Sequence, residues 1–139
     1  MKIFLDANVL ISVLNKEYPL FTISSRILSL AGTKQFQIYT SPICLAIAFY
    51  FAKKKYKAPI AKQKMGILCD HIEIAEATMS SVKKCLDNPE INDFEDGLEY
   101  YATIENKCNC IITEDKKDFY FSKVEVLNCH DFFMKYLAP

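Results

Sequence analysis

Short apolar runs predict five strands along the chain. Residues 3–5 and 110–113 form runs without polar alternation, which is typical of strands buried on both faces of a sheet. Residues 36–40, 71–75 and 124–127 are further short strand-like segments, and the second of these is expected at an edge of the sheet.

Between these strands, apolar residues recur at helical spacing. Val9, Leu10, Val13 and Leu14 predict a helix directly after Asp6. Further helices are expected up to Gly32 as a C-cap, over 42–55, over 59–69, from Ser80 or Ser81 through 86, from Asn92 or Asp93 onward, and over 131–137.

Two of these helices carry more specific expectations. The helix over 42–55 is almost wholly apolar at first, so we expect it to be buried on most sides. The helix that begins near Asp93 is expected to present one apolar face, made of Phe94, Leu98, Tyr101, Ala102 and Ile104.

The alternation of strands and helices predicts the fold class. We expect an α/β fold of three layers, with a central parallel sheet of about five strands and helices on both faces. With 139 residues, the chain is expected to form one domain, residues 1–139.

Composition limits the partners and the location. The chain has 17 Lys and Arg against 17 Asp and Glu, so overall charge does not indicate a nucleic-acid partner and RNA contact would need a local basic patch. We find no signal peptide and no stretch near the ~20 apolar residues of a membrane span. We therefore expect a cytoplasmic protein with no membrane partner, whose six cysteines are free thiols packed in a core.

The candidate chemistry lies at the ends of the two buried strands. Asp6 follows the first and Asp115 follows the second, and neighbouring parallel strands end at the same edge, where open α/β sheets bind ligands. Asp93 and Asp96, spaced i, i+3, can both lie on the first turn of the next helix. The open alternative is that these acids only cap helices, whose N-termini favour negative charge.

Carboxylates that converge on one cleft repel each other unless a cation neutralises them. Oxygen ligands of this kind suit Mg²⁺ or Mn²⁺, and such an ion can activate a water and stabilise charge on a phosphodiester. The sequence contains no P-loop, no G-x-S-x-G motif and no well-placed histidine. These absences argue against NTPase and acyl hydrolase chemistry. The residues alone therefore favour a metal-dependent phosphodiesterase or nuclease.

Three segments, in order, resemble the motifs of PIN domains. Residues 4–10, Phe-Leu-Asp-Ala-Asn-Val-Leu, resemble the first motif, and residues 93–98, Asp-Phe-Glu-Asp-Gly-Leu, resemble the third motif in the DFEDAL form of one subfamily. Residues 111–119 are similar to the closing motif. The resemblance implies a parallel five-stranded sheet and a ribonuclease that depends on Mg²⁺ or Mn²⁺. Many bacterial members are toxins of VapC type, blocked by a small antitoxin.

The resemblance assigns roles residue by residue. Asp6, Asp96 and Asp115 are the expected catalytic residues and metal ligands. Supporting roles are expected for Asn8, Asp93, Thr113 and Asp118. Contacts with the RNA backbone are expected from Lys53, Lys54, Lys55, Lys116 and Lys117. For the lysines over 53–57, the open alternative is a solvated helix end that complements the helix dipole.

The chain departs from the family pattern at its second acid. The family usually has a Glu about one turn into the helix after the second strand, and Ile47 stands there in this chain. Compensation by Asp93 or Glu95 is left open. The main hypothesis is an active PIN ribonuclease, which would be the toxin of a toxin–antitoxin pair. The alternative is a catalytically degenerate PIN-fold module that binds RNA or protein.

Two further expectations concern the oligomeric state and a third class of function. A homodimer is suggested by the resemblance, with residues 43–51 and 119–121 as contact surfaces unless they pack in the core. A phospho-acceptor receiver or a phosphatase is a third, less favoured class, because a haloacid-type phosphatase should have D-x-D at the first strand, where the third residue here is Asn8.

Overall fold

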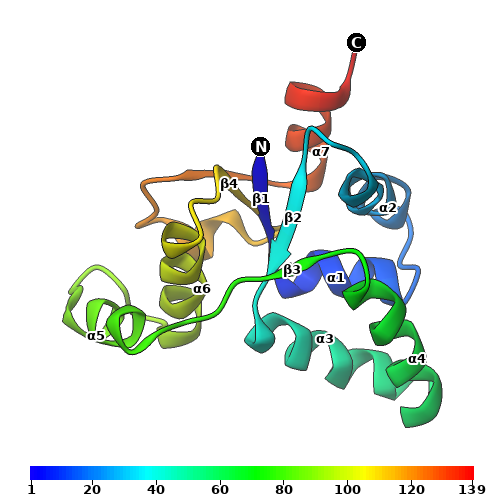
Figure 1. Cartoon of the computed structure of the whole chain (residues 1–139), viewed down its shortest axis with the longest axis horizontal. Helices are drawn as coiled ribbons and strands as arrows, with labels where there is room; N and C mark the ends of the chain where they lie inside the picture. Colours follow the sequence, from blue (N-terminus) through cyan, green and yellow to red (C-terminus); the bar gives the residue numbers. More distant parts are fainter.

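The computed structural model describes residues 1–139. Five strands form one parallel sheet in the order β3-β2-β1-β4-β5 (Figure 1). The strands are β1 (Lys2–Leu5), β2 (Gln37–Thr40), β3 (Glu73–Ile74), β4 (Cys110–Ile112) and β5 (Glu125–Leu127). The expected edge position of the third strand is confirmed.

Helices lie on both sides of this sheet, with α5 and α6 on one side and α1, α2 and α7 on the other (Figure 1). The α-helices are α1 (Ala7–Leu14), α2 (Phe21–Ser29), α3 (Pro42–Lys55), α4 (Ala58–Cys69), α5 (Met79–Asp87), α6 (Phe94–Glu105) and α7 (Cys129–Phe132). Shorter helical segments are η1 (Leu30–Gly32), η2 (Lys116–Phe119) and the π-helical η3 (Phe133–Leu137). The predicted α/β fold with a five-stranded parallel sheet is confirmed. None of the helices is long and apolar enough to cross a membrane.

The central position of β1 determines where a ligand site can form. The chain leaves β1 to build β2 and β3 on one side, then returns to build β4 and β5 on the other. The strand order therefore reverses next to β1, and the carboxyl edge at such a point is where doubly wound sheets bind ligands. Both strands at this point are rigidly held, because Ile3, Phe4, Leu5, Ile111 and Ile112 are fully buried.

The prediction that α3 is buried on most sides is wrong. Only Cys44, Ala48 and Ala52 are buried, while Tyr50 and Phe51 are 53% and 42% exposed. The helix packs on α1 and α4 through these small buried residues. Much of its remaining surface faces solvent. Of the aromatic residues over 119–121, the first and last are buried and Tyr120 is 60% exposed.

The predicted apolar face of α6 is also wrong in part. Phe94 and Ile104 are exposed, whereas Glu99 and Tyr100 are buried. The helix lies between α5 and the sheet, so it is covered on more than one side. Tyr100 packs edge-on against Phe121 with ring centroids 5.2 Å apart, and its hydroxyl accepts the backbone N–H of Lys123.

Helices α5 and α7 start earlier than expected, because other residues cap them. Helix α5 is opened by Thr78, whose hydroxyl accepts the N–H of Ser81 while the Ser81 hydroxyl accepts the N–H of Thr78. The last helix begins at Cys129 because Asn128 caps it. Five cysteines are buried, as expected, and Cys69 is exposed.

Helix α6 approaches α5 closely at Gly97, where the resembling motif has Ala. An ideal Cβ at this position would lie 2.2 Å from Cys85 Sγ and 2.8 Å from Ile91 Cγ2. Overpacking of this kind costs about 1–3 kcal/mol, and the alanine would regain at most ~1 kcal/mol of helix propensity. We therefore expect Gly97→Ala to lower the free energy of unfolding by about 1 kcal/mol, measured by urea denaturation.

The loss should be smaller in a Cys85→Ala background, where the nearest clashing atom is absent. An equal loss in both backgrounds would show that the close approach to α5 is not its cause.

Candidate metal centre

Asp6 lies at the carboxyl end of β1 and is held by three neighbours. Its Oδ1 accepts the N–H of Ala7 at 2.7 Å, which makes it the N-cap of α1. Its Oδ2 accepts the Thr113 hydroxyl at 2.8 Å, and its own N–H donates to the carbonyl of Ile112 at 3.0 Å. Asp6 is therefore tied to the end of β4 through both side chain and backbone.

Asn8 joins the ends of β1 and β4. Its Nδ2 donates to Thr113 Oγ1 at 3.0 Å and to Asp115 Oδ2 at 3.2 Å, and its Oδ1 accepts the N–H of Glu114 at 3.1 Å. The Thr113 hydroxyl is fully buried and also accepts the N–H of Asp115. The network orients two carboxylates, those of Asp6 and Asp115, with donors from Asn8 and Thr113.

The first turn of α6 adds a second group of acids. Asp93 caps this helix by accepting the N–H of Asp96 at 3.1 Å. Partial burial and, after it, the charges of Asp93, Asp118 and Asp6 together raise the pKa of Asp96 to about 7. The charge of Asp6 thus acts on Asp96, and Asn8 donates to the carboxylates of both Asp6 and Asp115.

Two residues that the sequence did not single out complete this cluster. Glu99, one turn beyond Asp96 on α6, is 1% exposed, and Cys44 on α3 is fully buried. The Cys44 thiol donates to Glu99 Oε1 and lies 3.9 Å from Asp6 Oδ1. Burial first, and then the charge of Asp6, raise the pKa of Glu99 to about 10; burial and Glu99 raise the pKa of the Cys44 thiol well above its usual value.

A signal for Glu99 was present in the sequence. It follows Asp96 at a spacing of three, which places both carboxylates on one helix face. Cys44 carries no such signal, because a cysteine in an apolar helix is usually a core residue.

Ile47, at the position of the family's second acid, is half-buried and packs against the hydrophobic core. Cys44, one turn earlier on the same helix, is the α3 residue that reaches Asp6 and Glu99. No carboxylate enters the cluster from α3, since this helix contains none.

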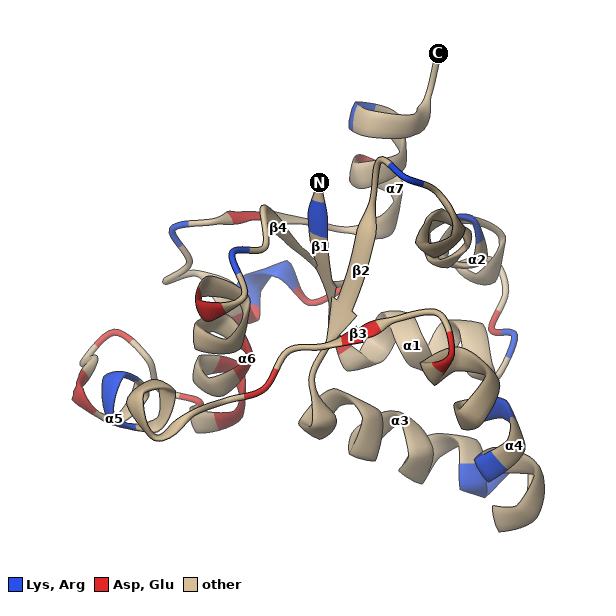
Figure 2. Ribbon diagram, viewed as in Figure 1, with Lys and Arg blue, Asp and Glu red and all other residues tan.

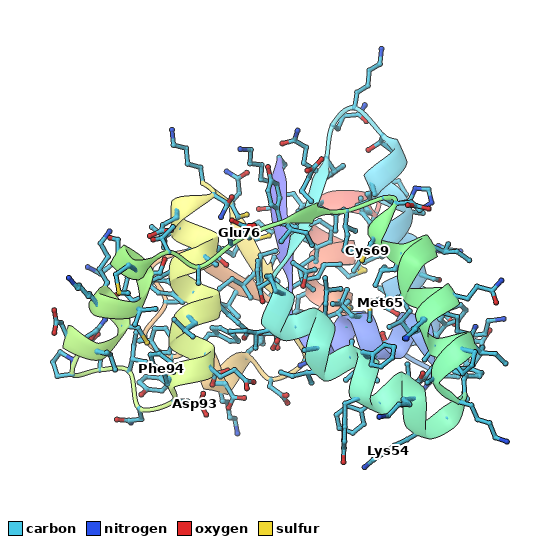
Figure 3. The ribbon with its side chains drawn as sticks, turned by 60° about the horizontal axis from the view of Figure 1, so that its bottom comes forward. Lys54, Met65, Cys69, Glu76, Asp93 and Phe94 are labelled. Carbon is cyan, nitrogen blue, oxygen red and sulfur yellow. The ribbon has the colours of Figure 1, made fainter.

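The lysines expected to contact RNA lie in two places. Lys116 and Lys117 follow Asp115 directly in η2, whereas Lys53, Lys54 and Lys55 end α3, away from its N-terminal Cys44 (Figure 2). Figure 3 shows Lys54 at the far end of α3, well apart from Asp93 and Phe94 at the start of α6. Lys54 Nζ lies 4.4 Å from the Tyr50 ring centroid, so this lysine makes a cation–π contact within its own helix.

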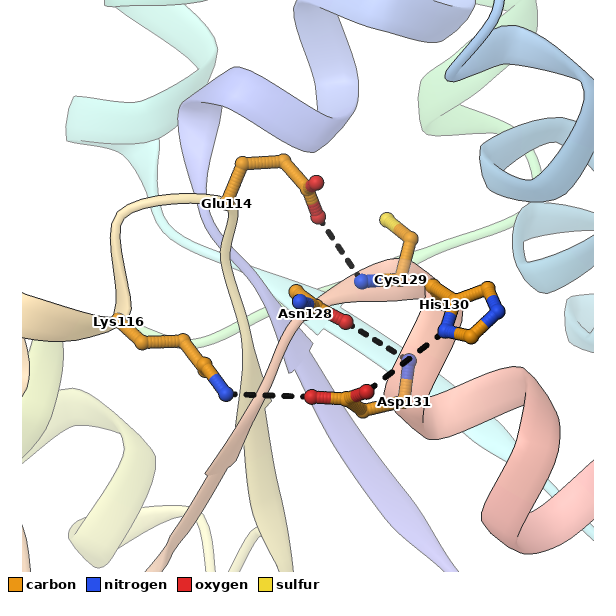
Figure 4. A network of polar contacts seen from close by, with 6 residues as sticks. All are labelled: Glu114, Lys116, Asn128, Cys129, His130 and Asp131. Carbon is orange, nitrogen blue, oxygen red and sulfur yellow. Dashed lines mark hydrogen bonds and ion pairs between the residues drawn. The ribbon is translucent and has the colours of Figure 1, made fainter.

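A separate polar network supports the segment after β4 (Figure 4). Glu114 Oε2 accepts the N–H of Cys129, and Lys116 pairs with Asp131 at 3.1 Å. Asp131 also lies 3.7 Å from His130, and Asn128 accepts its N–H. Glu114 therefore points away from the carboxylate cluster and anchors α7, and the Lys116 cation is already paired.

The cluster has the chemistry of a divalent-cation site. Ligand atoms of Asp6, Cys44 and Glu99 lie within 4.8 Å of one another, and Glu99 Oε2 is buried without a hydrogen-bond partner. An unpaired buried carboxylate oxygen beside further acids is what a bound cation would satisfy. The donor set is dominated by oxygen, which suits Mg²⁺ or Mn²⁺.

The fold is a parallel α/β sheet, and its candidate site lies at the switch point, where proteins of this class bind ligands. A family model described as "PIN domain" matches residues 2–117, which is most of the chain. The chain therefore belongs to the PIN domain family. Comparison with curated protein sequences gives no match.

Two solved structures share the fold. One is a crystal structure of VapBC2 from Rickettsia felis bound to a DNA fragment from their promoter, with 21% identity, a TM-score of 0.67 and coverage of 92% of this chain and 98% of that chain. The other is Mycobacterium tuberculosis VapC20, a sarcin–ricin-loop-cleaving toxin, with 15% identity, a TM-score of 0.64 and coverage of 88% and 98%.

The elevated pKa of Asp96 leads to a pH prediction for the metal-free protein. The pKa of Asp96 is about 7 in the folded state, against 3.8 for an ordinary Asp carboxyl such as that of the unfolded chain. Between these two pH values the folded state therefore binds more protons than the unfolded state. Folding stability should therefore fall as the pH rises from about 4 to about 7. We expect the melting temperature in EDTA to decrease between pH 5 and pH 8, and the decrease to be shallower in Asp96→Asn.

The matched control is Asp70→Asn, which removes an exposed carboxylate at the end of α4. It should retain the wild-type pH dependence. Parallel curves for Asp96→Asn and the wild type would refute the link between this carboxyl and the slope.

Proposed function

We propose that the chain is a metal-dependent endoribonuclease. One observation carries this proposal: Asp6, Asp96 and Asp115, which are far apart in the sequence, gather with Asn8 and Thr113 at the carboxyl edge between β1 and β4. Membership of the PIN domain family supports nuclease chemistry at such a cluster.

Each residue has a proposed role. Asp6, Asp96 and Asp115 would hold Mg²⁺ or Mn²⁺. When bound, the ion would activate a water and neutralise charge that develops on the RNA phosphodiester. Asn8 and Thr113 keep the carboxylates of Asp6 and Asp115 oriented through the hydrogen bonds described above.

Asp93 and Asp118 act on Asp96 through their charge and make the cluster more attractive to a cation. Contacts with the RNA backbone are proposed for two groups of lysines. Near the cluster, the Lys117 side chain makes no hydrogen bond or ion pair within the chain, whereas the Lys116 cation is paired with Asp131 and would have to leave it to contact RNA. Lys53, Lys54 and Lys55 lie at the distal end of α3, so only an RNA that extends along this helix would reach them.

The likeness to VapBC2 and VapC20 supports a finer proposal, that the chain is the toxin of a toxin–antitoxin pair. The partner would then be a small antitoxin protein that covers the carboxylate cluster. A homodimer is also proposed, and exposed Tyr50 and Phe51 on α3 provide apolar surface for protein contact.

Ile47 favours a second candidate function. An apolar residue in place of the family's second acid is compatible with a degenerate module that binds RNA or a protein without cleaving. The two candidates differ in metal binding, because a degenerate module has no use for a divalent ion at the cluster.

The ribonuclease proposal is tested by cleavage of a single-stranded RNA in Mn²⁺ or Mg²⁺. Asp6→Asn should lower the cleavage rate about 100-fold or more, the order of effect of losing a key electrostatic group at an active site. The asparagine keeps the helix-cap oxygen, so the fold should be retained.

Asp70→Asn makes the same chemical change at an exposed position and should cleave like the wild type. Equal cleavage by Asp6→Asn would show that the activity arises elsewhere or from a contaminant. The absence of both metal binding and cleavage would favour the binding module.

A further inference from the structure

We propose that Glu99 is a metal ligand and that it supplies from α6 the carboxylate that α3 lacks. The inference rests on the proposed metal-dependent function and assigns a ligand to that site beyond Asp6, Asp96 and Asp115. In this chain the acid opposite Asp6 would have moved from one helix to another, with Cys44 filling the space on α3.

The burial of Glu99 is the first observation behind this assignment. The side chain is 1% exposed, its Oε1 accepts the Cys44 thiol, and no N–H or O–H donor of another residue reaches its Oε2. Buried carboxylate oxygens are rarely left unpaired, because the loss of solvation is costly. No lysine or arginine forms an ion pair with Glu99, so the chain supplies no cation that would neutralise a negative charge on this carboxyl group.

The second observation is how close the Glu99 carboxyl group lies to Asp6 and Cys44. Ligand atoms of Glu99, Asp6 and Cys44 fall within 4.8 Å of one another. An ion with bonds of about 2.1 Å holds its ligands roughly 3 to 4 Å apart, so small side-chain rotations would place Glu99 and Asp6 on one ion. Asp96 lies one helical turn before Glu99, on the same face of α6.

The other acids offered as substitutes for the missing Glu fit less well. Asp93 is exposed and its carboxylate caps α6 by accepting the N–H of Asp96. Glu95 is exposed as well. Only Glu99 combines deep burial, an unpaired oxygen and proximity to Asp6.

A competing explanation is that Glu99 is a neutral core residue whose purpose is to accept the Cys44 thiol. That role predicts no response to divalent ions. The two explanations are separated by metal-binding measurements, which need no assay of RNA cleavage.

The first experiment is calorimetric titration of Mn²⁺ into purified protein. Glu99→Gln is nearly isosteric and takes away the carboxylate that would bind the ion, so we expect Mn²⁺ affinity to fall at least tenfold. Without metal, the variant should melt near the wild-type temperature, because the amide keeps the size of the buried side chain.

Two matched variants make the same Glu-to-Gln change. Glu90→Gln, at an exposed site where the side chain makes no hydrogen bond, should bind Mn²⁺ like the wild type. Glu95→Gln, on the same helix, should weaken binding less than Glu99→Gln does. Wild-type affinity in Glu99→Gln, or a larger loss in Glu95→Gln, would overturn the assignment.

A second measurement uses the unmodified chain and does not depend on how the variant folds. In carbon-detected NMR, diamagnetic Mg²⁺ should shift the carboxyl carbon signal of Glu99 together with those of Asp6 and Asp96. A shift at Asp6 and Asp96 without one at Glu99 would refute this inference and leave the proposed function standing. No shift at any of the three would refute both.

Discussion

Repulsion between carboxylates is the constraint on which the rest of this structure depends. Asp6, Asp96 and Glu99 are held close together in a partly or fully buried setting, where like charges are costly. A fold tolerates such an arrangement only if the surrounding structure fixes each group firmly. Here Asp6 is fixed by the Ala7 N–H and the Thr113 hydroxyl, and α6 is fixed between α5 and the sheet. The energetic cost is concentrated at the one edge where the strand order reverses, which is where a cation would relieve it.

The scaffold and the site are connected through particular contacts. Burial of Ile3–Leu5 in β1 and of all of β4 sets the position of the two strand ends that Asp6 and Thr113 follow. On the other side, the close approach of α5 at Gly97 sets how near α6 comes, and Gly97 lies between Asp96 and Glu99 in the sequence. Glu114, next to Asp115, turns away to hold the N–H of Cys129, so the segment after β4 contributes to both the site and the packing of α7.

Much of the fold could be predicted because its signals are local. Unbroken apolar runs identified the buried strands, Ser41 and Asp93 were recognisable as caps, and the alternation of elements predicted the parallel sheet. The errors came from tertiary context. Helix α3 uses small residues for its buried face and exposes Tyr50, which hydrophobicity alone cannot indicate. The role of Asn8 as a bridge to Asp115 depends on strand pairing, and the burial of Glu99 depends on the packing of α6 between α5 and the sheet (Figure 1).

The position of an acid in the sequence is a poor guide to its position in such a site. Two helices, α3 and α6, both reach the carboxyl edge of the sheet, and a side chain from either can fill the same volume beside Asp6. Loss of a carboxylate from α3 therefore removes a ligand only if α6 offers no other. In this chain the α3 contribution is a small buried thiol, and the space beside it is occupied by the carboxyl group of Glu99. An apolar Ile47 is consequently weak evidence for lost catalysis, because the number of acids that face Asp6 can be kept while their helix of origin changes.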